Sequence, residues 1–131
     1  TKYAASQGYA KAQFILGLCY ANGTGVRQNN KEAVYWYRKS ANQGYANAQN
    51  NLGNCYKYGK GCEKSLELAV DLFLKSSEQG NIKAFCNLAI CYEEGTGVEK
   101  NIETAIAYYR KAANQGDKFS KEKLMKLEQN K

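Results

Sequence analysis

The chain is organised around one stretch, residues 80–116, which reads GNIKAFCNLAICYEEGTGVEKNIETAIAYYRKAANQG. The same pattern occurs three times along the chain. Glycines recur every 36 residues, at positions 8, 44, 80 and 116. Leu-Gly (Leu-Ala in the third copy), Cys-Tyr and Gln-Gly pairs recur at the same spacing. A fixed period in the range of roughly 20 to 50 residues is the signature of a stacked repeat array. The sequence therefore predicts three full repeats, at residues 8–43, 44–79 and 80–115.

Each repeat is predicted to contain two helices. The first helix has one apolar face, since in the first repeat its apolar residues fall at helical spacing: Ala12, Leu16, Cys19 and Tyr20. A Gly-x-Gly loop ends this helix, because glycine takes the left-handed cap that other residues resist. Residues that make good N-caps then begin the second helix of each repeat: Asn29, Ser65 and Asn101.

The second helices carry a buried stripe that also repeats. Its predicted members are Ala33, Val34, Tyr37 and Ala41, then Ala69, Val70, Phe73 and Ser77, then Ala105, Ile106, Tyr109 and Ala113. Two first helices contain an interior glycine, Gly17 and Gly53. An interior glycine costs a helix about 1 kcal/mol relative to alanine, so we expect a backbone to approach closely at these positions.

Partial repeats stand at both ends. Residues 1–7 match residues 109–115, which predicts the end of a preceding helix, and residues 117–129 are predicted to form a capping helix. The whole of 1–131 is thus predicted to be a single all-α domain. We expect its open N-terminal end to be the weakest part of the stack and a candidate surface for self-association.

Composition argues against several classes of function. The sequence contains no histidine, which removes the commonest general base and the commonest zinc ligand. Its one close pair of carboxylates, Glu93 and Glu94, is adjacent on a helix and cannot converge. We therefore predict no enzyme and no cofactor. No apolar run approaches about 18 residues, so no membrane partner is predicted.

The net charge of +7 is uneven. Residues 1–44 carry six basic side chains and one acidic one, whereas residues 45–80 and 81–116 each carry four of either sign. A nucleic-acid-binding protein presents a continuous basic face, which this distribution does not provide. A nucleic-acid partner is therefore disfavoured, although the basic first repeat keeps it open as an alternative.

The five cysteines do not form the even set of a small secreted domain. Cys19, Cys55 and Cys91 are one repeat apart, and helix axes about 8–10 Å from each other leave them too distant for a disulfide. Cys55 and Cys62 could approach each other, so a bridge between them stays open. The odd count favours a cytoplasmic location over a secreted one without fixing it.

The repeated unit A-x-x-x-L-G-x-C-Y, followed by G-T-G-V and A-x-x-W/Y-Y-R-K-A-A-N-Q-G, resembles the Sel-one-like repeat (SLR), a relative of the tetratricopeptide repeat. The second repeat departs from it at Gly59-Lys-Gly61-Cys62 and at Leu72-Phe73-Leu74. The resemblance implies a right-handed α-solenoid of antiparallel helix pairs whose first helices line the concave side. It also implies a non-catalytic scaffold or adaptor. Some relatives have been suspected to be cell-wall hydrolases, which is a further alternative.

Aligning the Leu-Gly pairs with the tetratricopeptide unit places four positions of each first helix on the inner wall. These are Lys11, Phe14, Leu18 and Ala21, then Asn47, Asn50, Asn54 and Lys57, then Lys83, Cys86, Ile90 and Glu93. An asparagine amide both donates and accepts, so the three asparagines could hold the backbone of an extended peptide. The other interpretation is that they form the ordinary polar face of a helix. The predicted function is a protein–protein interaction module whose partner is a protein or peptide.

Overall fold

The computed structural model describes residues 2–6 and 8–130, and this part of the chain forms eight α-helices in sequence. They are α1 (Lys2–Ser6), α2 (Ala10–Asn22), α3 (Asn30–Asn42), α4 (Ala46–Tyr58), α5 (Leu66–Glu78), α6 (Ile82–Glu94), α7 (Ile102–Asn114) and α8 (Lys118–Gln129). No helix in the described ranges is long and apolar enough to cross a membrane.

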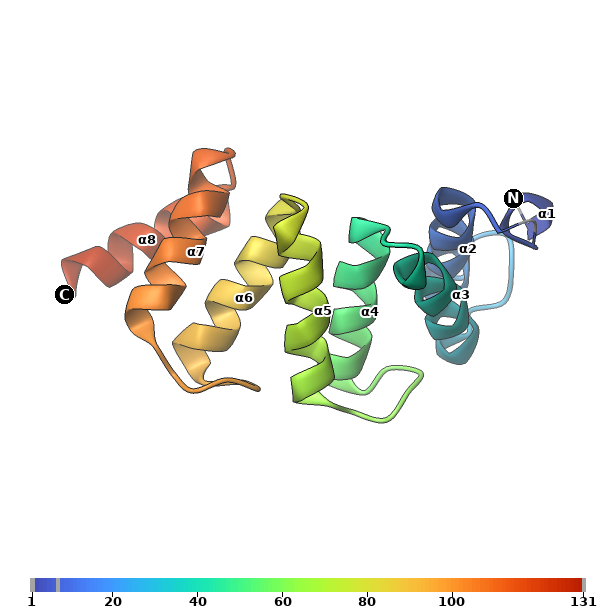
Figure 1. Ribbon diagram of the computed structural model, residues 1–131, viewed down its shortest axis with the longest axis horizontal. Helices are drawn as coiled ribbons and strands as arrows, with labels where there is room; N and C mark the ends of the chain where they lie inside the picture. The colour runs from blue at the N-terminus through green and yellow to red at the C-terminus, as the bar shows by residue number, and fades with distance from the viewer. Residues whose placement is uncertain (1, 7, 131) are drawn as a thin grey trace.

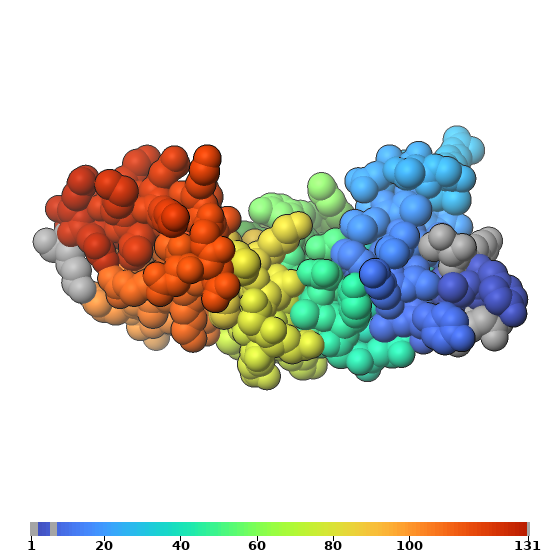
Figure 2. Space-filling model, turned by 90° about the horizontal axis from the view of Figure 1, so that it is seen from above, coloured from blue at the N-terminus to red at the C-terminus, as the bar shows by residue number. Residues whose placement is uncertain are grey.

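The helices pair in the order in which the chain makes them. The main contacts join each helix to the next one, and the closest pairs are α2 with α3, α4 with α5 and α6 with α7. Figure 1 shows them side by side along the long axis, from α1 at one end to α8 at the other. Seen from above, the body is elongated and its outline is hollowed along one edge (Figure 2). The predicted all-α solenoid of antiparallel helix pairs is confirmed.

The predicted caps are present. Gly23, Gly59 and Gly95 end the first helices in the left-handed region, with φ between 66° and 72°. The second helices begin at residues whose side chains accept a hydrogen bond from a backbone N–H three positions on, as N-caps do: Asn29, Ser65 and Asn101.

The core lies between successive helices, and the predicted stripe of the second helices is buried with one difference. Ser77 is only half-buried, whereas its neighbour Ser76 is fully buried. The hydroxyl of Ser76 donates to the backbone oxygen of Ala46 at 2.8 Å, and Ser40 does the same for Ala10 at 2.7 Å. Each serine therefore ties a second helix to the first turn of its own partner helix.

The interior glycines lie where a side chain would collide with an aromatic ring. A Cβ on Gly17 would lie 2.6 Å from the ring of Tyr37, and one on Gly53 would lie 2.6 Å from the ring of Phe73. Backbone oxygens of the second helices follow at 3.3 and 3.2 Å. The expected close approach is confirmed, but the ring rather than the backbone is the nearer neighbour.

The second glycine of the loop carries contacts between repeats in the second and third repeats. Gly61 packs directly against the backbone of Asn30, with no room for a Cβ, and a Cβ on Gly97 would lie 2.7 Å from the backbone oxygen of Leu66. Asn30 and Leu66 are the first residues of α3 and α5. The loop of one repeat thus rests on the start of the preceding repeat's second helix.

The ends of the stack differ from each other. At the N-terminal end Ala5 of α1 is buried and packs with Leu16 and Trp36; positions 1 and 7 of the partial helix predicted at 1–7 lie outside the described residues. At the other end α8 begins at the N-cap Asp117, whose carboxylate accepts from the Ser120 N–H. The repeat boundaries drawn from the sequence remain a prediction, since helix positions alone do not say where a repeat is cut.

Candidate functional site

Two adjoining hollows open among the first helices of the repeats. The first, of about 550 Å³, is lined by Leu18, Ala21, Asn22, Asn30, Ala33, Tyr37, Asn51, Asn54, Cys55, Tyr58, Lys60 and Asn87. The second, of about 320 Å³, is lined by Asn50, Asn54, Lys83, Cys86, Asn87, Ile90, Asp117 and Phe119. Because Asn54 and Asn87 line both, the hollows form one continuous surface. We call it the asparagine groove.

Hydrogen bonds within the protein already hold several of the groove's amides. Asn87 donates from Nδ2 to Oδ1 of Asn50 at 2.7 Å, and Asn51 forms a hydrogen bond with the Tyr37 side chain. Burial raises the pKa of Tyr37 and the bond from Asn51 only partly offsets this, so the hydroxyl is neutral. In the described part of the chain, the Asn54 amide has no side-chain partner. It is therefore available to a ligand at the junction of the two hollows.

The charged groups are few and unevenly placed. Lys60 is the one charged side chain among the residues that line the first hollow. Lys83 and Asp117 line the second. Asp117 is already engaged, since it accepts from the Ser120 N–H at 2.9 Å and from Cys86 Sγ at 3.3 Å. Hydrogen bonds from Ser120 hold the pKa of Asp117 below its ordinary value, so this carboxylate stays ionised.

Apolar side chains line both hollows beside the amides. Leu18 and the ring of Tyr37 belong to the first, and Ile90 and Phe119 belong to the second. Phe119 is 47% exposed, so a large part of its ring is accessible to a ligand. The groove therefore offers amide groups along its length with apolar surface on either side.

Seven of the twelve residues predicted for the inner wall line the groove: Leu18, Ala21, Asn50, Asn54, Lys83, Cys86 and Ile90. The other five do not line it: Lys11, Phe14, Asn47, Lys57 and Glu93. The ring of Phe14 packs against Tyr37 and Tyr45, with centroids 6.0 and 5.4 Å away. The Lys57 ammonium lies 5.4 Å from the centroid of the Tyr58 ring.

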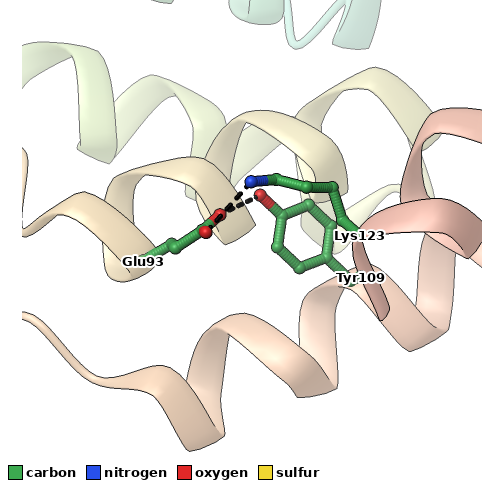
Figure 3. A network of polar contacts seen from close by, with 3 residues as sticks. All are labelled: Glu93, Tyr109 and Lys123. Carbon is green, nitrogen blue, oxygen red and sulfur yellow. Dashed lines mark hydrogen bonds and ion pairs between the residues drawn. The ribbon is translucent and has the colours of Figure 1, made fainter. Parts of the chain in front are cut away.

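Glu93 is committed to a contact between three helices. Its carboxylate accepts from the Tyr109 hydroxyl at 2.6 Å and from Lys123 Nζ at 3.0 Å, joining α6, α7 and α8 (Figure 3). Burial disfavours the ionised form of Glu93, but these two hydrogen bonds outweigh burial and lower its pKa. The side chain therefore stabilises the end of the stack.

Asn50 differs most from the sequence interpretation. It lines the second hollow, yet only 2% of the residue is exposed, and its amide oxygen is held by Asn87. Replacing it would disturb the packing of α4 on α6 as well as the groove. Asn54, four residues on, is the cleaner residue to test.

Sequence reasoning missed several lining residues: Tyr37, Asn51, Tyr58, Lys60, Asn87 and Phe119. Asn51 and Asn87 share one repeat position, immediately after the predicted Asn50 and Cys86, so a wider inner wall would have included them. Lys60 had a clear signal. It stands in the Gly-x-Gly loop where the first and third repeats have Thr24 and Thr96.

The five cysteines are free thiols in the structure. Burial raises the pKa of Cys55 to about 11, and the neighbouring Cys62 adds to the shift. Both are therefore protonated near neutral pH and are poor nucleophiles. Cys86 is half-buried, and burial raises its pKa as well.

Comparison with known families gives a match over most of the chain. The model of the Sel1 repeat matches residues 10–45, 46–81 and 83–117. These segments begin two or three residues after the repeats drawn from the glycines.

Solved structures give similar results. A Sel1 repeat protein from Oxalobacter formigenes is 37% identical, with a TM-score of 0.85 over 95% of this chain and 94% of that one. The protective antigen c5321 of uropathogenic Escherichia coli, which displays an SLR fold, is 40% identical with a TM-score of 0.88. The match spans 91% of this chain and 26% of the c5321 chain. Cysteine rich protein B of Helicobacter pylori shares the fold. It is 23% identical, with a TM-score of 0.72 over 90% of each chain.

A curated relative matches over a shorter range. The rat protein DAP3-binding cell death enhancer 1 is 53% identical over 38 residues, which is 29% of this chain. The match spans 8% of the rat protein.

Proposed function

The chain belongs to the Sel1 repeat family, and from that premise we propose that it is a non-catalytic interaction module that holds an extended segment of a partner protein in the asparagine groove. Solenoids of stacked repeats create extended concave surfaces, and these surfaces are what such proteins use for binding. The rat relative is named for binding another protein, which agrees with this class of function.

One observation carries the proposal. Asn54 lies where the two hollows meet, and its amide has no side-chain partner within the described residues. An amide that donates and accepts at once can pair with the N–H and C=O of an extended backbone, whatever the partner's side chains are. Leu18 on one side and Ile90 on the other would then receive apolar side chains of the same segment.

The chemistry of the groove favours binding over catalysis. Nucleophilic catalysis needs an activated nucleophile and a base within hydrogen-bond reach. The sequence has no histidine, and the groove's one lining carboxylate, Asp117, accepts hydrogen bonds from Ser120 and Cys86. The Cys86 thiol, whose pKa is raised, is not activated by that contact.

A pull-down with two matched variants tests the proposal. Immobilised wild-type chain, Asn54→Ala and Asn42→Ala are each incubated with lysate of the source cells, and retained proteins are cross-linked and mapped. Both variants replace an asparagine by alanine, but Asn42 is exposed at the end of α3 and does not line the groove. We expect a protein cross-linked to the groove, with an affinity about three- to tenfold lower for Asn54→Ala and unchanged for Asn42→Ala.

Two results would contradict the proposal. One is a retained protein that cross-links outside the groove and binds both variants equally. The other is retention of nucleic acid alone, lost steeply as salt rises, which would move the function to the basic first repeat.

A further inference from the structure

The first hollow of the groove has an unbalanced charge. Its lining includes five asparagines, the hydroxyls of Tyr37 and Tyr58, one lysine and no carboxylate. Lys60 has no ion-pair partner within the described residues. A hollow with one cation and several amide donors favours a ligand that carries negative charge.

The fold holds Lys60 at this position. The next residue, Gly61, packs against the backbone of Asn30, so the loop cannot move away from the start of α3 without losing that contact. Gly97 makes the equivalent contact one repeat later, but there the middle residue of the loop is Thr96. The lysine is therefore a property of the second repeat and not of the repeat pattern.

The N-terminus of α3 adds further positive charge beside the first hollow. Asn30 and Ala33, in the first turn of α3, line the hollow. The N-terminal turn of a helix carries partial positive charge from its aligned peptide dipoles. The carboxylate in that turn, Glu32, does not line the hollow.

We propose that the first hollow binds the carboxylate of an aspartate or glutamate side chain in the captured segment. The carboxylate pairs with the Lys60 ammonium and accepts from the amides of Asn54 and Asn22. This inference rests on the proposed function and narrows it, since the partner segment is then acidic where it crosses the hollow. The second hollow does not share the preference, because a carboxylate, Asp117, lines it together with Lys83.

Two blocked peptides test the inference. One reads Gly-Leu-Glu-Leu-Gly, and the other has glutamine in place of glutamate. Each is titrated into isotope-labelled chain while the backbone and asparagine side-chain amide resonances are followed by NMR. We expect the glutamate peptide to shift the resonances of Lys60 and Asn54 and to bind about tenfold more tightly than the glutamine peptide.

Two variants with the same change of charge localise the effect. Lys60→Thr restores the residue that the other repeats carry, and Lys64→Thr removes a lysine that lines a different hollow, beside Arg38 and Tyr56. The preference for glutamate should disappear in Lys60→Thr and persist in Lys64→Thr.

Each other outcome would overturn the inference. Equal binding of both peptides in the groove would remove the carboxylate preference and leave the groove as a binding site. Binding of neither peptide, or a loss of equal size in both variants, would also overturn it. A single-stranded oligothymidylate is titrated as well. If it displaces the glutamate peptide from the same resonances, and its binding weakens equally in Lys60→Thr and Lys64→Thr, then Lys60 attracts polyanions in general and not a carboxylate in particular. The proposed function is judged separately, by the cross-linking result.

Discussion

The hydroxyl of Tyr109 donates a hydrogen bond of 2.6 Å to the carboxylate of Glu93, and Lys123 Nζ donates to the same carboxylate at 3.0 Å. Tyr109 comes from α7, Glu93 from α6 and Lys123 from α8, so three helices share one polar contact. Tyr109 is fully buried, and burial together with the Glu93 carboxylate raises the pKa of its hydroxyl. This contact fastens the last helix, which has no second helix of its own in the described residues to cover it.

Replacing Glu93 by glutamine should loosen α8. The substitution keeps the size of the side chain but removes the charge that Lys123 meets, and we expect a loss of about 1 kcal/mol in unfolding free energy. Relative to wild type, amide hydrogen exchange should accelerate more in α8 than in α4. Glu128→Gln is the matched control, because its ion pair with Arg110 is about half exposed on both sides, at 45% and 53%. Equal effects of the two substitutions would show that the Glu93 contact does not hold α8.

The same contact predicts a dependence on acid. The pKa of Glu93 lies below its ordinary value of 4.5, so its contribution to stability is present above that value and is lost as pH falls through the folded-state pKa. The stability difference between wild type and Glu93→Gln should therefore be largest near neutral pH and should shrink below about pH 4.5. Melting curves of both proteins over this range measure it, and a difference independent of pH would contradict the prediction.

Local sequence signals were enough to predict most of the fold. The helices, their glycine C-caps and the N-caps Asn29, Ser65 and Asn101 follow from residues within a few positions of each other. The apolar positions of the core follow from the helical period. These features repeat three times, so each copy supports the others.

Contacts between helices were not predictable in the same way. The bonds of Ser76 to Ala46 and of Asn87 to Asn50 join residues that are 30 and 37 positions apart. Whether an asparagine on a first helix faces solvent or its neighbour depends on how closely two helices pack. The sequence placed Asn50 and Asn54 on one surface, but Asn50 is buried and bonded to Asn87 of α6, whereas Asn54 is left available.

The contact of Gly61 with Asn30 gives a prediction about coupling between repeats. Alanine at Gly61 must adopt φ near 77° and must also push the backbone of Asn30 away. Gly25 has a similar φ of 72° and open space around it. Both substitutions carry the cost of left-handed backbone, about 1–2 kcal/mol, and Gly61→Ala should cost about 1–3 kcal/mol more.

Chemical denaturation of the two glycine variants measures this difference. Because the extra cost arises between two repeats, Gly61→Ala should also lower the cooperativity of unfolding. Similar losses in Gly25→Ala and Gly61→Ala would mean that the loop does not couple the first repeat to the second.

Cys55 gives a prediction on the alkaline side. Burial raises its pKa from 9.0 to about 11, so the folded chain holds the proton more tightly than the unfolded chain does. The protonated thiol therefore stabilises the fold fully at pH values below the ordinary pKa of cysteine. This stabilisation is lost as the pH rises toward the pKa of Cys55 in the folded chain. Stability should therefore fall between about pH 9 and pH 11, and Cys55→Val, which cannot ionise, should flatten the fall.

The melting temperature of both proteins is followed across this range at fixed ionic strength. Cys62, Cys86 and Cys91, whose pKa values are also raised by burial, should leave a residual slope in the variant. Parallel curves for wild type and Cys55→Val would show that ionisation of this thiol does not limit the alkaline stability of the stack.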